Sequence, residues 1–223
     1  KMSLSQNVIN NYTEILESEM KAAMGCTEPI AIAYCSAVAI KALGKKADRY
    51  EVGCSGNIIK NTLAVTVPQT GGQRGLEVAV LAGGIGGNAD KELEVLSDIT
   101  ASQIQEIKEA VGKKIVKVSL LDTTHQLHII VDAYSGTDHA KACLADTHTG
   151  IYHIEKNGNV LFNEELGESD KQEIDYSKLN IRDILLYANE VELTPIRPLF
   201  EREITYNTAI SDEGLKNDWG AGV

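Results

Sequence analysis

The sequence of 223 residues is poor in aromatic side chains, with one Trp, two Phe and eight Tyr. Its core must therefore be built from Ala, Val, Ile and Leu, and the 43% apolar content can fill one large core or two small ones. Basic residues are also scarce: 21 Lys and Arg stand against 32 Asp and Glu, a formal net charge of −11. This balance argues against nucleic acid and anionic membranes as partners.

Long apolar runs, a secretory leader and paired cysteines are missing as well. No segment reaches the roughly 18 apolar residues of a membrane-spanning helix, and the N-terminus lacks a charged-then-apolar pattern. The cysteines show no C-x-x-C spacing, which argues against a disulfide framework or a self-contained zinc site. We therefore expect a cytoplasmic protein with reduced thiols. The four cysteines are Cys26, Cys35, Cys54 and Cys143.

The first half of the chain has helical periodicity. Apolar residues recur at helical spacing over 8–24, and the nearly all-apolar segment 29–43, stopped by Gly44, is typical of a helix buried on most sides. A short strand over 50–54 and a turn over 58–61 follow. We predict further helices over 76–81, ending before the glycine-rich segment 83–87, over 90–96, and over 101–111 with Thr100 as its cap.

The pattern changes to β-branched clusters beyond residue 112. We predict strands over 115–121, 127–131, 148–155 and 160–162, a helix over 135–145, and a hairpin turn at Asn157-Gly158. The expected fold is α+β: a mainly helical region, residues 1–112, precedes a small β-β-α-β-β sheet unit, residues 113–165. An acidic linker begins the last part, residues 166–223, in which a helix over 181–190 ends at 193–195.

The segment Gly-Cys-Thr-Glu-Pro at 25–29 presents a cysteine at the start of the apolar helix. Thr27 is suited to be the N-cap, and Pro29 is tolerated in the first turn. A helix N-terminus lowers the pKa of a thiol, which makes Cys26 a better nucleophile, base or metal ligand, while the charge of Glu28 opposes that shift. The alternative interpretation is a small buried apolar residue beside a helix cap.

Two further polar clusters interrupt apolar sequence, Ser-Gly-Asn-Ile-Ile-Lys-Asn at 55–61 and Thr-Gly-Gly-Gln-Arg-Gly at 70–75. Glycine beside hydrogen-bonding side chains brings backbone amides against a small anion. Lys60 or Arg74 can supply the positive charge, and Arg suits a carboxylate better because it binds in a bidentate manner. Together the clusters predict a site for a small amino acid or carboxylate, with ordinary turns as the alternative.

The remaining motifs carry less weight. The glycine-rich segment 83–87 follows a helix rather than a strand, so it matches a nucleotide-binding loop poorly. His125 and His128 lack the spacing of a zinc protease and would point to opposite faces of a strand, so we assign them surface or structural roles. His148 begins a predicted strand and could face a site. Pairing His148 with Cys26 in a thiol hydrolase is an alternative without a local sequence signature.

In chain order, the segments at 25–29, 55–61 and 70–75, Gly-Gly-Asn at 86–88 and Asp-Thr-His-Thr at 146–149 resemble the L-cysteine desulfidase family. That family is related to the alpha chain of the iron-sulfur L-serine dehydratase. The resemblance spans essentially the whole chain. It implies a lyase that uses no PLP and holds a [4Fe-4S] cluster, whose open iron acts as a Lewis acid on the leaving group. L-Cysteine would be eliminated to sulfide, and the aminoacrylate would hydrolyse to pyruvate and ammonia.

The resemblance also implies roles for individual residues. Cys26 would lie at the cluster or the substrate, as a ligand or a base. The substrate pocket would be lined by Ser55, Asn57, Lys60, Asn61 and Arg74. The implied further cluster cysteines are absent from the 223 residues, so we expect the N-terminal part of a longer protein, inactive alone. Its partner would be its own C-terminal half or a second copy.

Two other functions stay open beside the elimination of L-cysteine. An L-serine dehydratase would use the same site to deaminate serine. A non-catalytic module would bind a small amino acid through the same polar clusters without any chemistry.

Overall fold

The computed structural model describes residues 3–23, 25–166 and 174–218. The chain divides into two compact units: Ala23–Ser169, which we call the sheet unit, and Lys1–Ala22 with Asp170–Val223, which we call the helical unit. The predicted boundaries at 112 and 165 stay a prediction. Most of the predicted linker, residues 167–173, lies outside the described residues.

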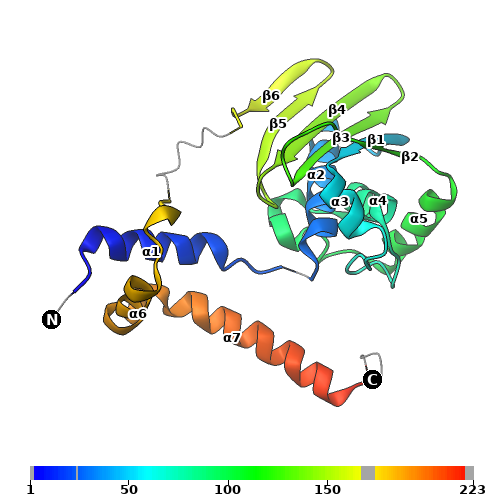
Figure 1. Cartoon of the computed structure of the whole chain (residues 1–223). Helices are drawn as coiled ribbons and strands as arrows, with labels where there is room; N and C mark the ends of the chain where they lie inside the picture. Colours follow the sequence, from blue (N-terminus) through cyan, green and yellow to red (C-terminus); the bar gives the residue numbers. More distant parts are fainter. Residues whose placement is uncertain (1–2, 24, 167–173, 219–223) are drawn as a thin grey trace. The chain divides into compact units, whose positions relative to one another are not determined.

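The sheet unit contains six strands in the order β2-β1-β3-β4-β5-β6 (Figure 1). β1 pairs with β2 in parallel and with β3 in antiparallel orientation, and the remaining neighbours are antiparallel. With the helices around it, this mixed sheet confirms the α+β class. The strands are β1 Arg49–Cys54, β2 Val116–Leu120, β3 His128–Ser135, β4 Asp138–Ala145, β5 Ile151–Lys156 and β6 Asn159–Asn163.

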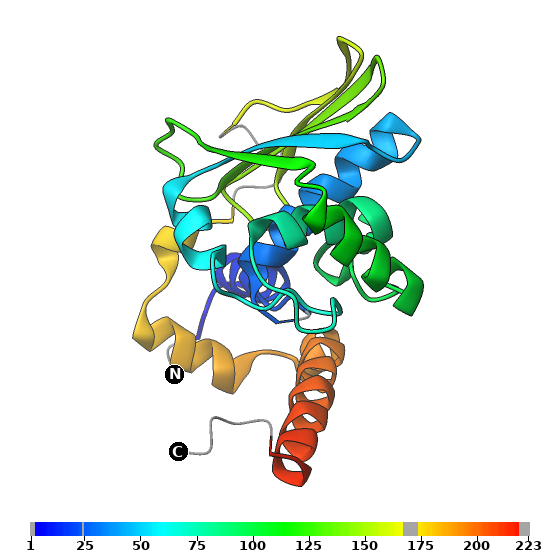
Figure 2. The same ribbon diagram turned by 90° about the vertical axis from the view of Figure 1, so that its right-hand side faces the viewer.

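Helix α2 forms the centre of the sheet unit, because it packs on β3, β4 and β5 and also on α4 (Figures 1 and 2). Its sequence is apolar on most sides for this reason, and Gly44 ends it with φ +77, as predicted. Alternate residues of β3 face this core: Ile129, Val131 and Ala133 are fully buried. The helices of this unit are α2 Thr27–Leu43, α3 Gly56–Thr62, α4 Leu76–Gly86, α5 Ala101–Gly112 and the 3-10 helix η1 Ala89–Glu94.

Helix α4 runs through the glycine-rich segment, so the prediction that this helix ends at residue 81 is wrong. A β-carbon on Gly83 would collide with the backbone of Ala33, and one on Gly84 would collide with the ring of Tyr50. These glycines allow α4 to approach α2 and β1 closely, whereas the sequence pattern was typical of a turn.

Residues 138–145 form strand β4, so the predicted helix over 135–145 is wrong. Gly136 has φ +59 in the two-residue turn that joins β3 to β4, where Ser135 lies opposite Asp138. The small side chains of β4 favour helix intrinsically, but they alternate between the two sheet faces with a period of two. The fully buried positions are Ala140, Ala142 and Leu144.

Two local predictions are confirmed in detail. Thr100 caps α5 in a capping box, accepting from the backbone N–H of Gln103 while the Gln103 side chain accepts from the Thr100 N–H. Asn157 and Gly158 have φ +50 and +80 between β5 and β6, as a type I′ hairpin turn requires. The predicted helix over 90–96 is instead the 3-10 helix η1.

The helical unit contains α1 Gln6–Glu19, the 3-10 helix η2 Tyr176–Lys178, α6 Ile181–Glu190 and α7 Leu193–Lys216. The predicted helix over 181–190 is confirmed. This helix ends before residue 193, as predicted, but α7, which was not predicted, begins there with Pro195 in its first turn, where the missing N–H is not needed. No described helix of the protein is long and apolar enough to cross a membrane.

Apolar side chains of α1, α6 and α7 line a groove of about 400 Å³ in the helical unit. Tyr12 and Tyr187 pack at its base with ring centroids 5.5 Å apart. Farther along α7 the apolar residues Ile204, Ile210 and Leu215 are 62%, 71% and 85% exposed. The second half of α7 is thus amphipathic without a covering partner among the described residues.

Candidate functional site

Cys26 is the N-cap residue of α2, one position before the Thr27 that the sequence favours. Its side chain is exposed, and its thiol donates a hydrogen bond to Oε2 of Glu28 over 3.1 Å. Gly25, the residue before Cys26, has φ +132, which glycine adopts without steric conflict. Gly25 also lies beside Pro68. The cysteine is therefore presented at the protein surface by the start of a buried helix.

The electrostatics of the thiol differ from the expectation. Partial burial, and then the hydrogen bond to the Glu28 carboxylate, raise the pKa of Cys26. The predicted lowering by the helix N-terminus is therefore wrong, because the thiol points at an anion that favours its protonated form. At neutral pH Cys26 is a hydrogen-bond donor more than a thiolate.

The carboxylate of Glu28 joins two of the sequence motifs. Asn61, near the end of α3, donates from Nδ2 to Oε1 of Glu28 over 3.4 Å, while Cys26 occupies the other oxygen. The hydrogen bond from Cys26 lowers the pKa of Glu28 most, and the hydrogen bond from Asn61 and the electrostatic effect of His148 lower it further. Glu28 is thus held as a carboxylate between α2 and α3.

His148 reaches this region from the turn between β4 and β5, and not from the start of a strand as predicted. Its electrostatic effect is the smallest of the causes that lower the pKa of Glu28. Of the segments of the resemblance, those at 25–29 and 55–61 are joined by hydrogen bonds at Glu28.

The other predicted site residues have different surroundings. Ser55 is 3% exposed and donates from Oγ to the carbonyl of Gln126 over 2.6 Å, so it anchors the segment that leads into β3. Asn57, Lys60 and Arg74 are exposed. The side chains of Lys60 and Arg74 form no hydrogen bond or ion pair with any other described residue, and no such contact joins them to Cys26.

The histidines before β3 are more organised than the sequence indicates. His125 lies in the loop before β3 and His128 begins that strand, yet their rings meet edge to face at 5.5 Å. Nδ1 of His125 lies 2.7 Å from Oδ1 of Asp146. The prediction that they point to opposite faces is therefore wrong, because only one of them belongs to the strand.

The cysteines do not form a ligand set for a [4Fe-4S] cluster, which takes its ligands from several thiolates. Burial raises the pKa of Cys54 to about 12, and it also raises the pKa values of Cys35 and Cys143. The thiol of Cys35 faces the carbonyl of Ala142 at 3.4 Å. No group of three candidate metal ligands occurs among the described residues. Of the four cysteines, Cys26 is exposed and the other three are buried, so Cys26 carries the accessible thiol.

Comparisons with known proteins place this chain beside uncharacterised bacterial proteins. It is 45% identical to a UPF0597 protein of Lachnoclostridium phytofermentans over 94% of this chain and 50% of that protein. The UPF0597 protein of Treponema denticola is 40% identical over 98% of this chain and 51% of its own length. The chain thus spans about half the length of the curated relatives it matches. No protein-family model and no solved structure matches it.

Proposed function

We propose that this chain carries the substrate side of a carbon–sulfur lyase that eliminates sulfide from L-cysteine without PLP. The observation that supports this is the bridge at Glu28, whose two carboxylate oxygens accept from Cys26 of α2 and from Asn61 of α3. These side chains come from two of the segments that resemble the L-cysteine desulfidase family.

We assign one group of the three motifs to each polar part of the substrate. Glu28, whose pKa is lowered, stays ionised and can hold the substrate ammonium group. Lys60 and Arg74 are uncommitted cations for the substrate carboxylate, and Arg74 can bind it in a bidentate manner. Cys26 holds its proton at neutral pH, which makes it a poor base and assigns it to the leaving-group end of the substrate.

The [4Fe-4S] cluster implied by the resemblance takes several thiolates, and the described cysteines of this chain belong to no group of three candidate ligands. It stays a prediction for a longer protein, to which this chain would contribute at most Cys26. We accordingly expect this chain alone to be inactive.

Sulfide release from L-cysteine tests the proposal. The complete gene product, reconstituted anaerobically with iron and sulfide and then desalted, should release sulfide and pyruvate in equal amounts. Cys26→Ala should abolish release, and Arg74→Gln should raise KM by about 10-fold or more, since it removes a charge-assisted contact of roughly 1.5–3 kcal/mol. Lys108→Gln, an exposed lysine of α5, is the control. Full activity of Cys26→Ala would refute the role of that thiol.

Two alternatives use the same residues. Faster pyruvate release from L-serine than from L-cysteine would make the enzyme a serine dehydratase. Saturable binding of an amino acid with neither product would make this a binding module, in which Lys60 and Arg74 would bind the carboxylate. A hydrolase with Cys26 as nucleophile has less support, because the thiol donates to Glu28 and its pKa is raised.

For the partner we propose the part of the longer protein that the relatives have in addition, because those relatives are about twice as long as this chain. Its docking surface would be the apolar side of α7, where Ile204 and Ile210 are exposed. In the complete gene product both side chains should be protected from solvent. Ile210→Glu should undock the additional part of the longer protein, which limited proteolysis would then cleave. Dimerisation through α7 instead would indicate a second copy as the partner.

The free cysteines fit the cytoplasmic location that we propose.

A further inference from the structure

Asp146 and His125 form an oriented acid–base pair. Nδ1 of the histidine lies 2.7 Å from Oδ1 of the aspartate, and their side chains are 31% and 52% exposed. Nε2 of His125 has no hydrogen-bond or ion-pair partner among the described residues. An imidazole fixed at Nδ1 by a carboxylate and open at Nε2 is the arrangement of a general base.

The β3–β4 hairpin holds this pair in place. His128 lies opposite Ala145, so the residues just before β3 and just after β4 become neighbours. The backbone N–H of Asp146 donates to the carbonyl of Leu127 over 3.0 Å, and that of His125 donates to Oγ1 of Thr123 over 3.2 Å. The geometry is thus fixed from both sides of the hairpin.

The backbone of Asp146 is itself unusual, with φ +64. Aspartate tolerates this left-handed conformation better than most residues, but it still carries strain that the surroundings must hold. The positive φ turns the chain directly after β4 into the turn that carries His148. Strain of this kind at the junction between a strand and a functional turn is common where a side chain must be aimed.

Two connections relate the pair to the Cys26 region. The turn that begins with Asp146 carries His148, whose charge acts on Glu28. The loop that contains His125 is held by a hydrogen bond between the carbonyl of Gln126 and Ser55, the N-cap residue of α3. The pair is thus linked along the chain to His148 and, through a hydrogen bond, to the start of α3.

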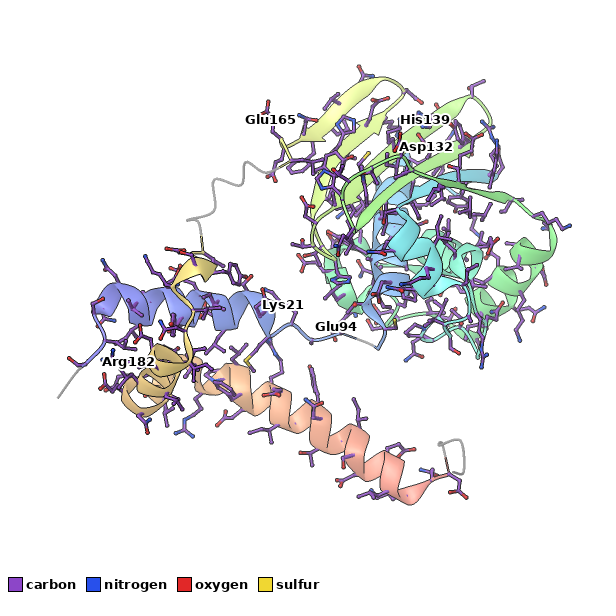
Figure 3. All side chains as sticks on the ribbon, viewed as in Figure 1. Lys21, Glu94, Asp132, His139, Glu165 and Arg182 are labelled. Carbon is purple, nitrogen blue, oxygen red and sulfur yellow. The ribbon has the colours of Figure 1, made fainter. Side chains whose placement is uncertain are left out.

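A second histidine–aspartate pair in the sheet unit has the same hydrogen-bond length but is also contacted by other side chains. Nε2 of His139 lies 2.7 Å from Oδ1 of Asp132 on the sheet face opposite the core, where both side chains appear together in Figure 3. Lys141 approaches the same carboxylate oxygen to 3.5 Å, and the ring of Tyr134 stacks on His139 at 4.7 Å. Lys141 and Tyr134 therefore already contact this pair. Because its N···O distance equals that of His125 and Asp146, His139 is a matched control for His125.

On the basis of the proposed lyase, we infer that His125, oriented by Asp146, is the base that removes the Cα proton of the amino-acid substrate. Nε2 accepts this proton while the C–H electron pair forms the Cα=Cβ bond. The Cβ–S bond breaks, and sulfur leaves with its electron pair as hydrosulfide. The aminoacrylate tautomerises to an imine, to which water adds before ammonia leaves, so that L-cysteine and water give pyruvate, ammonia and hydrogen sulfide. His125 is the catalytic residue and Asp146 a positioning residue.

Steady-state kinetics of the complete gene product test this role. His125→Gln should lower kcat at least 100-fold, within the range typical of general bases, with KM within about 3-fold. His139→Gln should keep kcat within about 3-fold. His125→Ala should regain activity with added imidazole, which separates a missing base from a misfolded loop.

Asp146→Asn should lower kcat with little change in KM and should remove the downfield Nδ1–H signal of His125 from the NMR spectrum. Loss of that signal with an unchanged kcat would show that the pair is purely structural. His125→Gln with full sulfide release would overturn the assigned base and leave the lyase intact. Absence of sulfide and pyruvate from the wild-type protein would refute the lyase, and the assigned base with it.

Discussion

Gly83 of α4 lies against the backbone carbonyl group of Ala33 in α2, with no room between them for a β-carbon. The contact sets the distance between the two most apolar helices of the sheet unit. Gly83→Ala should therefore destabilise the protein by about 1–3 kcal/mol, because backbone cannot move aside as a flexible side chain can. Urea unfolding followed by circular dichroism measures this change. Gly112→Ala in α5, where a β-carbon meets nothing within 4 Å, should keep or raise the midpoint. An unchanged midpoint for Gly83→Ala would contradict this packing.

Thr62 at the end of α3 is fully buried, and its hydroxyl has no hydrogen-bond partner in the part of the chain that the structure describes. Thr62→Val replaces it with a side chain of the same shape and should raise the free energy of unfolding by up to about 1–3 kcal/mol. The matched comparison is Ser36→Ala. The Ser36 hydroxyl is equally buried but donates to the carbonyl of Val80 over 2.8 Å, so this change should destabilise by about 1 kcal/mol. A loss of stability in Thr62→Val would show that the hydroxyl has a partner, such as a bound water.

The reactivity of Cys26 should follow the raised pKa of its thiol. A raised pKa means less thiolate at neutral pH, so alkylation by iodoacetamide should be slower at pH 7 than that of an unperturbed thiol and should increase as the pH rises. Glu28→Gln removes the negative charge beside the thiol, so its pH profile should shift to lower pH. Mass spectrometry after alkylation identifies the labelled residue. Fast labelling of the wild type at pH 7 would show that the helix N-terminus dominates.

The two ends of α7 should differ in their effect on stability. Ile196 is 4% exposed in the core of the helical unit, so Ile196→Ala should cost about 2–5 kcal/mol. Ile210 is 71% exposed, so Ile210→Ala in this chain should change stability by no more than about 0.5 kcal/mol. Thermal unfolding of the two variants gives the comparison. Equal losses would indicate that Ile210 is covered in solution, as by a second copy.

Elements whose boundaries are marked by a capping or turn motif could be predicted from the sequence. Thr100 with Gln103 defined the start of α5, and Asn157-Gly158 defined the last hairpin. The errors occurred where tertiary packing overrides local preference. The alanines of β4 favour helix until α2 covers one face of the strand, and the glycines of α4 are typical of a turn until Ala33 lies against them.

The candidate site was predictable only in part, for a related reason. The motif around Cys26 is visible in the sequence, but its partner Asn61 depends on how α3 packs beside α2. The pair of His125 and Asp146 depends on the β3–β4 hairpin, and its register is lost once residues 135–145 are assigned to a helix. With Gly136 interpreted as the turn, the two residues would have been expected side by side.

β1 lies inside the sheet although it is the first strand of the chain, and both of its neighbours, β2 and β3, follow it in sequence. β3 to β6 are joined by short turns and can pair soon after they are made. β1 and the apolar helix α2 must instead wait for partners that the ribosome delivers much later. Placing β1 between β2 and β3 therefore closes longer loops, at a larger cost in chain entropy, than any pairing among β3 to β6.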